Sequence, residues 1–108
     1  MKQGEIFFVQ FEPSVGFEIK KSRPGLIIQT EPYRNTVIVL PISSKRKTND
    51  RFEFTLKKSE LNRLYVDSVV ILDQVKSFDK SLFIGKVDEI SESDRTNILS
   101  RFKKLFED

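Results

Sequence analysis

Basic side chains gather in two stretches of the chain and are the first candidates for binding chemistry. Residues 43–63 carry seven Lys or Arg against three Asp or Glu, and Lys20, Lys21 and Arg23 form a second group. A fold that brings both stretches to one rim would create an anion-binding surface. The alternative is that both are solvated, Lys-rich loops, and the charge pattern leaves the two readings open.

The residue types that are missing exclude much catalytic chemistry. The 108 residues include no Cys, no His and no Trp, and the formal net charge is +3. Disulfides, thiolate nucleophiles, Cys/His zinc sites and Ser-His-Asp triads are therefore excluded. The sequence also lacks the tight group of carboxylates that a two-metal nuclease needs, so we expect neither a metal nor another cofactor.

Length and composition predict a single folded domain over residues 1–108. Hydrophobic residues make up 38% of the chain and include ten Phe, which is enough for one core. The apolar runs are far shorter than the roughly 20 residues of a membrane helix, and the first residues do not form an apolar signal segment. We therefore expect a cytoplasmic protein without membrane contact.

The elements that must position any site are mostly short strands. Runs of β-forming residues predict strands at residues 6–11, 26–29, 36–40, 52–56, 67–75 and 82–87. The second and third are expected to pair antiparallel across a turn. Alternation in the fourth predicts an edge strand with one wet face, and the unbroken apolar run in the fifth predicts a central strand. A turn is expected near residues 77–80.

The last segment has helical periodicity. Ser91 followed by Asp94 is typical of a helix N-cap. The apolar stripe of this helix, expected to serve barrel packing or a dimer seam, comprises Ile98, Leu99, Phe102, Leu105 and Phe106. The predicted fold class is mainly β: a small, strongly bent antiparallel sheet or partly open barrel, closed by a C-terminal helix.

Four stretches of the chain carry motifs, in order and over nearly its whole length. Residues 4–18 form an expected opening strand and a Pro-x-x-Gly-x-Glu loop, and residues 22–29 place Arg-Pro before an apolar strand. Residues 36–44 form an expected strand that ends in Pro-x-Ser-Ser, and residues 67–80 contain Asp-Gln-x-Lys-Ser-x-Asp. Together these stretches resemble the MazF/PemK family of toxin endoribonucleases, whose motifs include Pro-x-Thr/Ser-Ser and Asp/Glu-Gln-x-Arg-Thr-x-Asp.

The resemblance implies a fold and an activity. Members are described as SH3-like or CcdB-like dimeric barrels that cut single-stranded RNA at short sequences, without a metal, through a 2′,3′-cyclic phosphate. The expected partners are an mRNA substrate, a second copy of the chain and a cognate antitoxin with an acidic, partly disordered tail. Contact with DNA is expected only indirectly, through the antitoxin.

The resemblance also assigns site residues. The family's catalytic pair corresponds to Arg23 and Ser43, and Asp73 stands at an acidic position that some PemK-type members use. The expected RNA-binding residues are Phe17, Glu18, Lys20, Lys21, Ser44, Lys45, Arg46, Gln74 and Lys76.

RNA cleavage is chemistry that a chain without His or Cys can perform. RNA carries its own nucleophile, the 2′-hydroxyl, so an enzyme must align it, remove its proton and stabilise the developing charge. Arg23 is suited to hold the phosphate, although a guanidinium is a poor base because it stays protonated. Ser43 is suited to a hydrogen bond with a phosphoryl oxygen or the attacking hydroxyl. Asp73 is the one carboxylate base among the matched positions.

Each assignment has a structural alternative. Arg23 could simply anchor a turn to Glu18, and Ser43 could be an ordinary hydrogen-bonding residue at a strand end. Asp73 could pair with Lys76 or cap the turn near residue 77. Aromatic residues that could stack on bases, but are equally typical of a core, are Phe7, Phe8, Phe52 and Phe54.

A non-catalytic binding module on the same barrel is the competing function. The family's loop before Arg-Pro carries glycines, whereas residues 18–22 have none. Lys76 replaces an Arg of the signature and cannot make its bidentate contact with phosphate. A gyrase poison is a weaker third hypothesis, because the ending at residues 105–108 lacks the aromatic, small and apolar C-terminus of such proteins.

Overall fold

The computed structural model describes residues 1–11, 22–44, 50–57 and 67–107. Within these ranges the chain forms seven strands, one short 3₁₀ helix and one α-helix. In chain order they are β1 (Glu5–Gln10), β2 (Ser22–Gln29), β3 (Thr36–Ser43), β4 (Glu53–Leu56), β5 (Ser68–Ile71), β6 (Lys76–Asp79), η1 (Lys80–Leu82), β7 (Phe83–Glu89) and α1 (Glu92–Lys104). The predicted mainly β fold with a C-terminal helix is confirmed.

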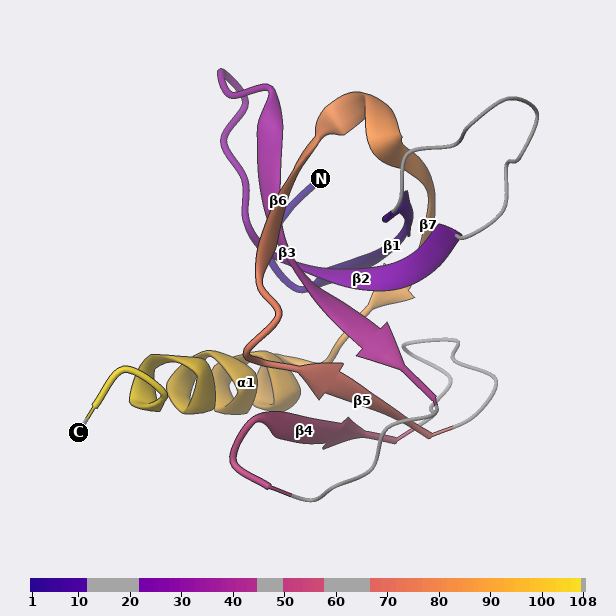
Figure 1. The fold of residues 1–108 in the computed structure, drawn as a ribbon. Coiled ribbons are helices and arrows are strands. Elements are labelled where there is room, and N and C mark those ends of the chain that lie inside the picture. The colour runs from indigo at the N-terminus through magenta and orange to yellow at the C-terminus, as the bar shows by residue number, and fades with distance from the viewer. Residues whose placement is uncertain (12–21, 45–49, 58–66, 108) are drawn as a thin grey trace.

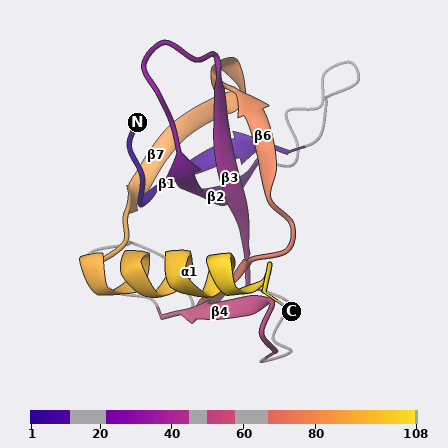
Figure 2. The same ribbon diagram turned by 90° about the vertical axis from the view of Figure 1, so that its left-hand side faces the viewer.

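The strands form one antiparallel sheet that curls strongly. Its order is β4-β5-β3-β2-β1-β7, and β6 pairs with β3 off this path. Figure 1 shows β1, β2, β3, β6 and β7 curving around one another, with β4, β5 and α1 below them. Figure 2 shows α1 lying alongside β4. The predicted antiparallel pairing of the second and third strands is confirmed, since Leu26 lies opposite Leu40.

Two hydrophobic clusters lie on opposite faces of the central strands. Neighbouring residues of β2 alternate between them: Leu26 belongs to the first cluster and Ile27 to the second. In β3, Leu40 belongs to the first and Val39 to the second. Both faces of these strands are therefore covered, which explains why their sequences are continuously apolar rather than alternating.

The prediction for residues 67–80 is partly wrong. The predicted strand 67–75 ends at Ile71, and the predicted turn at 77–80 is instead occupied by β6 and the start of η1. The reason is that β5 and β6 pair with different halves of β3: Ile42 lies opposite Val70, whereas Val39 lies opposite Lys76. Residues 72–75 form the irregular connection between these ladders. The interior position of β5, between β4 and β3, is as predicted.

β4 is at an end of the sheet, as its alternating sequence predicts. The alternation also predicts that both polar residues of this strand face solvent. This is correct for Thr55, which is exposed, and wrong for Glu53, whose side chain is buried. Glu53 lies opposite Ile71, and the backbone N–H of Leu72 donates to the carbonyl of Phe52 at 2.7 Å. This end of β4 is thus held against the start of the β5–β6 connection.

The C-terminal helix begins as its sequence indicates. The Ser91 hydroxyl accepts a hydrogen bond from the Asp94 N–H at 3.1 Å, the geometry of an N-cap. Ile98 is completely buried in the first cluster, and Phe102 packs against the same cluster. Phe106, beyond the end of α1 at Lys104, is 74% exposed and differs in this from the other stripe residues, although its ring meets the Phe102 ring edge-to-face with centroids 5.4 Å apart.

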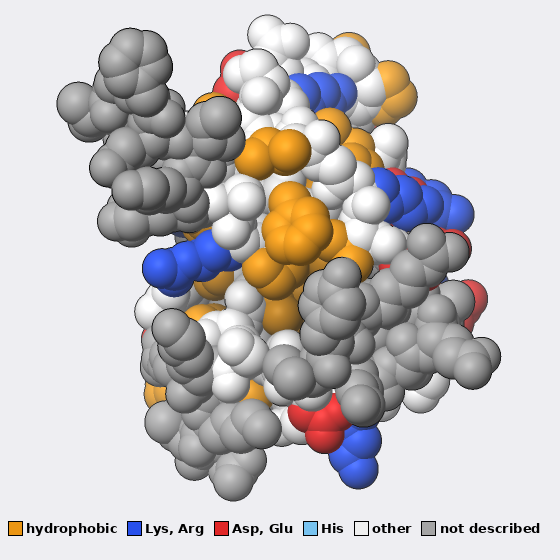
Figure 3. All heavy atoms as spheres, turned by 90° about the vertical axis from the view of Figure 1, so that its right-hand side faces the viewer, with side chains coloured by type: hydrophobic (Ala, Val, Ile, Leu, Met, Phe, Trp, Pro, Cys, Tyr) orange, Lys and Arg blue, Asp and Glu red, His pale blue; other side chains and the backbone are white. Residues whose placement is uncertain are grey.

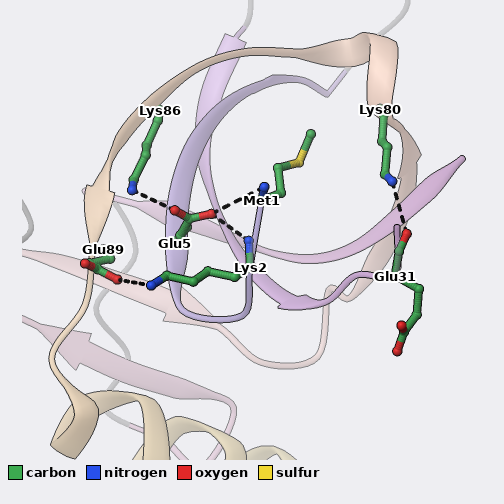
Figure 4. A network of polar contacts seen from close by, with 7 residues as sticks. All are labelled: Met1, Lys2, Glu5, Glu31, Lys80, Lys86 and Glu89. Carbon is green, nitrogen blue, oxygen red and sulfur yellow. Dashed lines mark hydrogen bonds and ion pairs between the residues drawn. The ribbon is translucent and has the colours of Figure 1, made fainter. Parts of the chain in front are cut away.

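A polar network joins the N-terminus to β1 and β7 (Figure 4). The buried Glu5 carboxylate accepts a 2.6 Å hydrogen bond from the backbone N–H of Lys2 and lies 2.6 Å from the Nζ of Lys86. Lys2 Nζ lies 3.7 Å from a Glu89 oxygen. Burial acts to raise the pKa of Glu5, but the hydrogen bonds from Lys86 and Lys2 outweigh it and hold this pKa below its ordinary value.

In the described ranges, no helix has the length and apolarity needed to cross a membrane.

Candidate active site

β2 and β3 separate at the place where the two predicted catalytic residues lie. The last directly opposed pair of these strands is Gly25 and Pro41. Beyond it, β2 continues beside β1, where Arg23 lies opposite Val9. β3 continues beside β5, where Ser43 lies opposite Val69. Figure 1 shows the resulting fork, with the start of β2 on one arm and the end of β3 on the other.

Arg23 and Ser43 lie on the same face of the sheet. Directly opposed residues share a face, and side chains alternate along each strand. Arg23 is two residues from Gly25, and Ser43 is two residues from Pro41. Each therefore points to the same face of the sheet as the Gly25–Pro41 pair. This is the face of the second cluster, to which Val39 belongs. The register therefore places the two side chains on one face, one on each arm of the fork.

Lys76 lies on this face as well, at the start of β6. It is opposite Val39, a member of the second cluster, and its side chain is exposed. The Arg23 side chain is also exposed, whereas Ser43 is half-buried. Among the residues that the structure describes, neither Arg23 nor Lys76 takes part in an ion pair. Both are exposed cations on the face that carries Ser43.

Asp73 and Gln74 lie in the connection between β5 and β6, and both are exposed. Because Lys76 is opposite Val39 and Val70 is opposite Ile42, this connection runs beside residues 40–41 of β3. The connection is therefore close to Ser43 along β3. Because it is irregular, the alternation of side chains along a strand does not fix the direction in which Asp73 or Gln74 points. The alternative pairing of Asp73 with Lys76 is not observed in the described part of the chain. Ser44 directly follows β3 and is exposed.

The sequence analysis missed two residues beside the fork, Phe11 and Gly25. A Cβ added at Gly25 would lie 2.5 Å from Cγ1 of Val39 and 3.4 Å from Cζ of Phe11. The Phe11 ring in turn meets the Phe78 ring edge-to-face, with centroids 4.8 Å apart. The available signal was a glycine inside a strand, which often marks a close approach of other groups.

The aromatic candidates for base stacking occupy different environments. Phe7 packs against the second cluster and meets the ring of Phe83, so it serves the core. Phe54 packs against the first cluster, beneath the guanidinium of Arg101. Phe8 is 40% exposed and lies opposite Pro24, so its parity places it on the other face from Arg23.

The remaining predicted RNA-binding residues are Phe17, Glu18, Lys20, Lys21, Lys45 and Arg46, and they lie outside the described residues. Figure 3 shows the side of the molecule where β2 begins and β3 ends. Hydrophobic side chains gather at the centre of this face, with Lys or Arg side chains to either side. Such a surface has both components of a single-strand binder, an apolar platform and cations for the backbone. In the described ranges, no group of three or more acidic residues is placed to hold a metal ion.

Comparison with known proteins identifies similar sequences over nearly the whole chain. The family model described as "PemK-like, MazF-like toxin of type II toxin-antitoxin system" matches residues 2–106. Endoribonuclease MazF of Staphylococcus epidermidis is 32% identical over 99 residues, which cover 86% of this chain and 80% of that protein. Endoribonuclease EndoA of Bacillus subtilis is 30% identical over 98 residues, which cover 85% of this chain and 82% of that protein.

The fold has a matching solved structure. The Mycobacterium tuberculosis toxin MazF-mt6 superposes with a TM-score of 0.76 at 21% sequence identity. The match covers 95% of this chain and 96% of that one.

Proposed function

Because the chain belongs to the family of PemK-like, MazF-like toxins of type II toxin–antitoxin systems, we propose that it is an endoribonuclease that cuts single-stranded RNA at short, specific sequences. The placement of Arg23 and Ser43 carries this proposal. Two side chains that the family resemblance assigns to catalysis, 20 residues apart in the sequence, share one face where β2 and β3 diverge. A phosphodiester bound in the fork would contact both arms.

The reaction needs no group beyond the chain, the RNA and water. The 2′-hydroxyl attacks the adjacent phosphorus and a 2′,3′-cyclic phosphate forms, while the bond to the 5′-oxygen of the next nucleotide breaks and this oxygen takes up a proton from water to become a 5′-hydroxyl. Arg23 holds the phosphate and stabilises the charge that develops on its oxygens. Ser43 donates a hydrogen bond to a phosphoryl oxygen. Asp73, on the neighbouring connection, is the proposed base for the 2′-hydroxyl proton.

The other predicted residues extend the RNA path away from the scissile phosphate. Lys76 shares the face of Arg23 and offers a point charge to a neighbouring phosphate. Gln74 and Ser44 flank the fork as hydrogen-bonding groups. The proposal also assigns RNA binding to six residues outside the described ranges, Phe17, Glu18, Lys20, Lys21, Lys45 and Arg46.

The family description also supports a regulated protein. We propose that a cognate antitoxin inhibits the chain by laying an acidic segment over the basic surface, and that the toxin acts as a cytoplasmic homodimer. Contact with DNA would be indirect, through the antitoxin.

The test is incubation of the purified, antitoxin-free protein with mixed single-stranded RNA in EDTA, followed by mapping of the cleaved ends. We expect discrete cuts with cyclic phosphate and 5′-hydroxyl ends. Arg23→Ala should lower cleavage by about 100-fold or more, because it removes the group that stabilises the transition state. Arg34→Ala is the matched control, since Arg34 is an exposed arginine in the β2–β3 connection.

Three results would contradict the proposal or part of it. No cutting by the folded wild-type protein would favour the non-catalytic binding module. Cutting that EDTA abolishes would overturn the metal-independent route. Equal activity of Arg23→Ala and Arg34→Ala would remove Arg23 from catalysis.

A further inference from the structure

We propose that Phe11 is a specificity-determining residue, whose ring stacks on the base next to the phosphate bound between Arg23 and Ser43. The inference rests on the proposed function and adds a base-recognition residue to those that the family resemblance assigns. It follows from where the Phe11 ring lies and from what holds it there.

The Phe11 ring lies on the same face of the sheet as Arg23, near the point where β2 and β3 separate. Phe11 directly follows β1, and its Cζ atom comes within 3.4 Å of the position that a Cβ of Gly25 would occupy. Gly25 shares its face with Arg23, two residues away, and is directly opposite Pro41. Same-face neighbours in a strand are about 7 Å apart. The tip of the ring is therefore roughly one such step from the position that carries Arg23, and Ser43 is one such step from Pro41 on the other arm.

The ring is held in place, and the residue as a whole is only partly covered. Phe78, buried in the second cluster, meets it edge-to-face at a centroid distance of 4.8 Å. Phe11 is itself only half-buried, unlike the fully covered Val9 and Val39 of the same cluster. An aromatic residue that is only partly covered, placed beside an exposed arginine, combines the two features with which proteins bind single-stranded nucleic acid: a ring for stacking and a cation for the backbone.

Gly25 is a condition for this arrangement. Any side chain at position 25 would enter the space between Val39 and the tip of Phe11, because its Cβ would lie 2.5 Å from Cγ1 of Val39. The absence of a side chain lets the ring approach β2 next to Arg23. A nucleotide held through its phosphate by Arg23 then has its base within reach of the ring.

The experiment compares Phe11→Leu with Phe83→Leu. Phe83 packs against the same second cluster but lies on β7. Val9 of β1 has Arg23 opposite it on one side and Phe83 opposite it on the other, so β1 separates Phe83 from Arg23. Leucine keeps apolar volume in both variants and removes the flat ring. The readout is kcat/KM on oligonucleotides that differ in one base next to the cleaved bond, with melting temperatures measured in parallel.

We expect Phe11→Leu to change the ratio of kcat/KM between the preferred and a non-preferred neighbouring base by about tenfold, because leucine offers no π-face for stacking. Phe83→Leu should leave this ratio unchanged at a similar loss of melting temperature. Phe11→Tyr, which retains the ring, should keep the wild-type preference.

The outcomes separate this proposal from the proposed function. If the wild-type protein cuts RNA but Phe11→Leu alters all substrates equally, Phe11 is only a packing residue and the inference fails while the function stands. If Phe83→Leu changes the preference as much as Phe11→Leu, the effect is transmitted by the core and the inference also fails. If the wild-type protein does not cut RNA, the proposed function fails, and the inference about Phe11 fails with it.

Discussion

Gly25 shows how one absent side chain governs the packing beside the fork. The space that a Cβ of Gly25 would take is already occupied by side chains of Val39, Phe11 and Val9. Protein interiors are packed closely enough that an added methyl group must displace something. At this position the displaced atom is Cγ1 of Val39, a buried β-branched residue with little freedom to rotate.

Gly25→Ala should therefore destabilise the protein by about 1–3 kcal/mol, through overpacking against Val39. The measurement is the free energy of unfolding from urea titration. Gly85→Ala is the matched control, because a Cβ at Gly85 meets nothing within 4 Å. A double variant with Val39→Ala should lose less stability than the sum of the two single changes. Equal effects at positions 25 and 85 would show that the close approach is absent.

Strand β3 is the element that organises the molecule. Its residues 36–39 pair with β6, its residues 38–41 pair with β2, and its last residues pair with β5. The fork arises because β3 leaves β2 after Pro41 in order to make this exchange. Arg23 and Ser43 thus owe their positions to a change of partner, not to a special loop. The helix is positioned more simply, by its cap and by the burial of Ile98.

Ser91→Ala should destabilise the protein by about 1 kcal/mol, because the N–H of Asp94 loses its hydrogen-bond acceptor. Ser93→Ala is the control, since Ser93 is exposed in the first turn of the same helix and alanine favours helix formation. Thermal unfolding followed by far-UV circular dichroism measures both. A neutral Ser91→Ala would mean that the cap does not limit the stability of α1.

At the scale of the whole molecule, polar side chains near the N-terminus connect β2, β7 and α1. Gln3 donates to the Ile28 carbonyl of β2 at 2.9 Å and accepts from Arg95 of α1 at 2.7 Å. Glu5 is held by Lys86 of β7 (Figure 4). Segments distant in the sequence are therefore connected through a few polar side chains at one edge of the sheet.

This network predicts a dependence of stability on pH. The pKa of Glu5 is lowered in the folded protein, against the opposing effect of burial, by Lys86 and the N–H of Lys2. A carboxyl group with a depressed folded-state pKa contributes stability above its unfolded value, and this contribution is lost as the pH falls through the folded value. Stability should thus decline below about pH 4.5, the ordinary value.

The check is urea unfolding of the wild type and Glu5→Gln between pH 7 and pH 3. Glu5→Gln should be less stable at pH 7 and should lose less additional stability on acidification, since it has no carboxylate to protonate. Glu107→Gln is the control, an exposed carboxylate near the C-terminus. Parallel curves for the wild type and Glu5→Gln would show that Glu5 does not carry the acid sensitivity.

The sequence by itself determined the types and order of most elements, the helix cap at Ser91 and the stripe residues that bury α1. These features depend on residues within a few positions of one another, so periodicity and capping chemistry indicate them. The motifs also indicated Arg23 and Ser43 one by one. Only the tertiary structure decided that they share a face, that residues 76–79 form a strand, that Glu53 is buried and that Phe11 lies over Gly25. Each of these depends on which distant strand β3 or β2 meets at that point, and such pairings are set by the packing of the whole sheet.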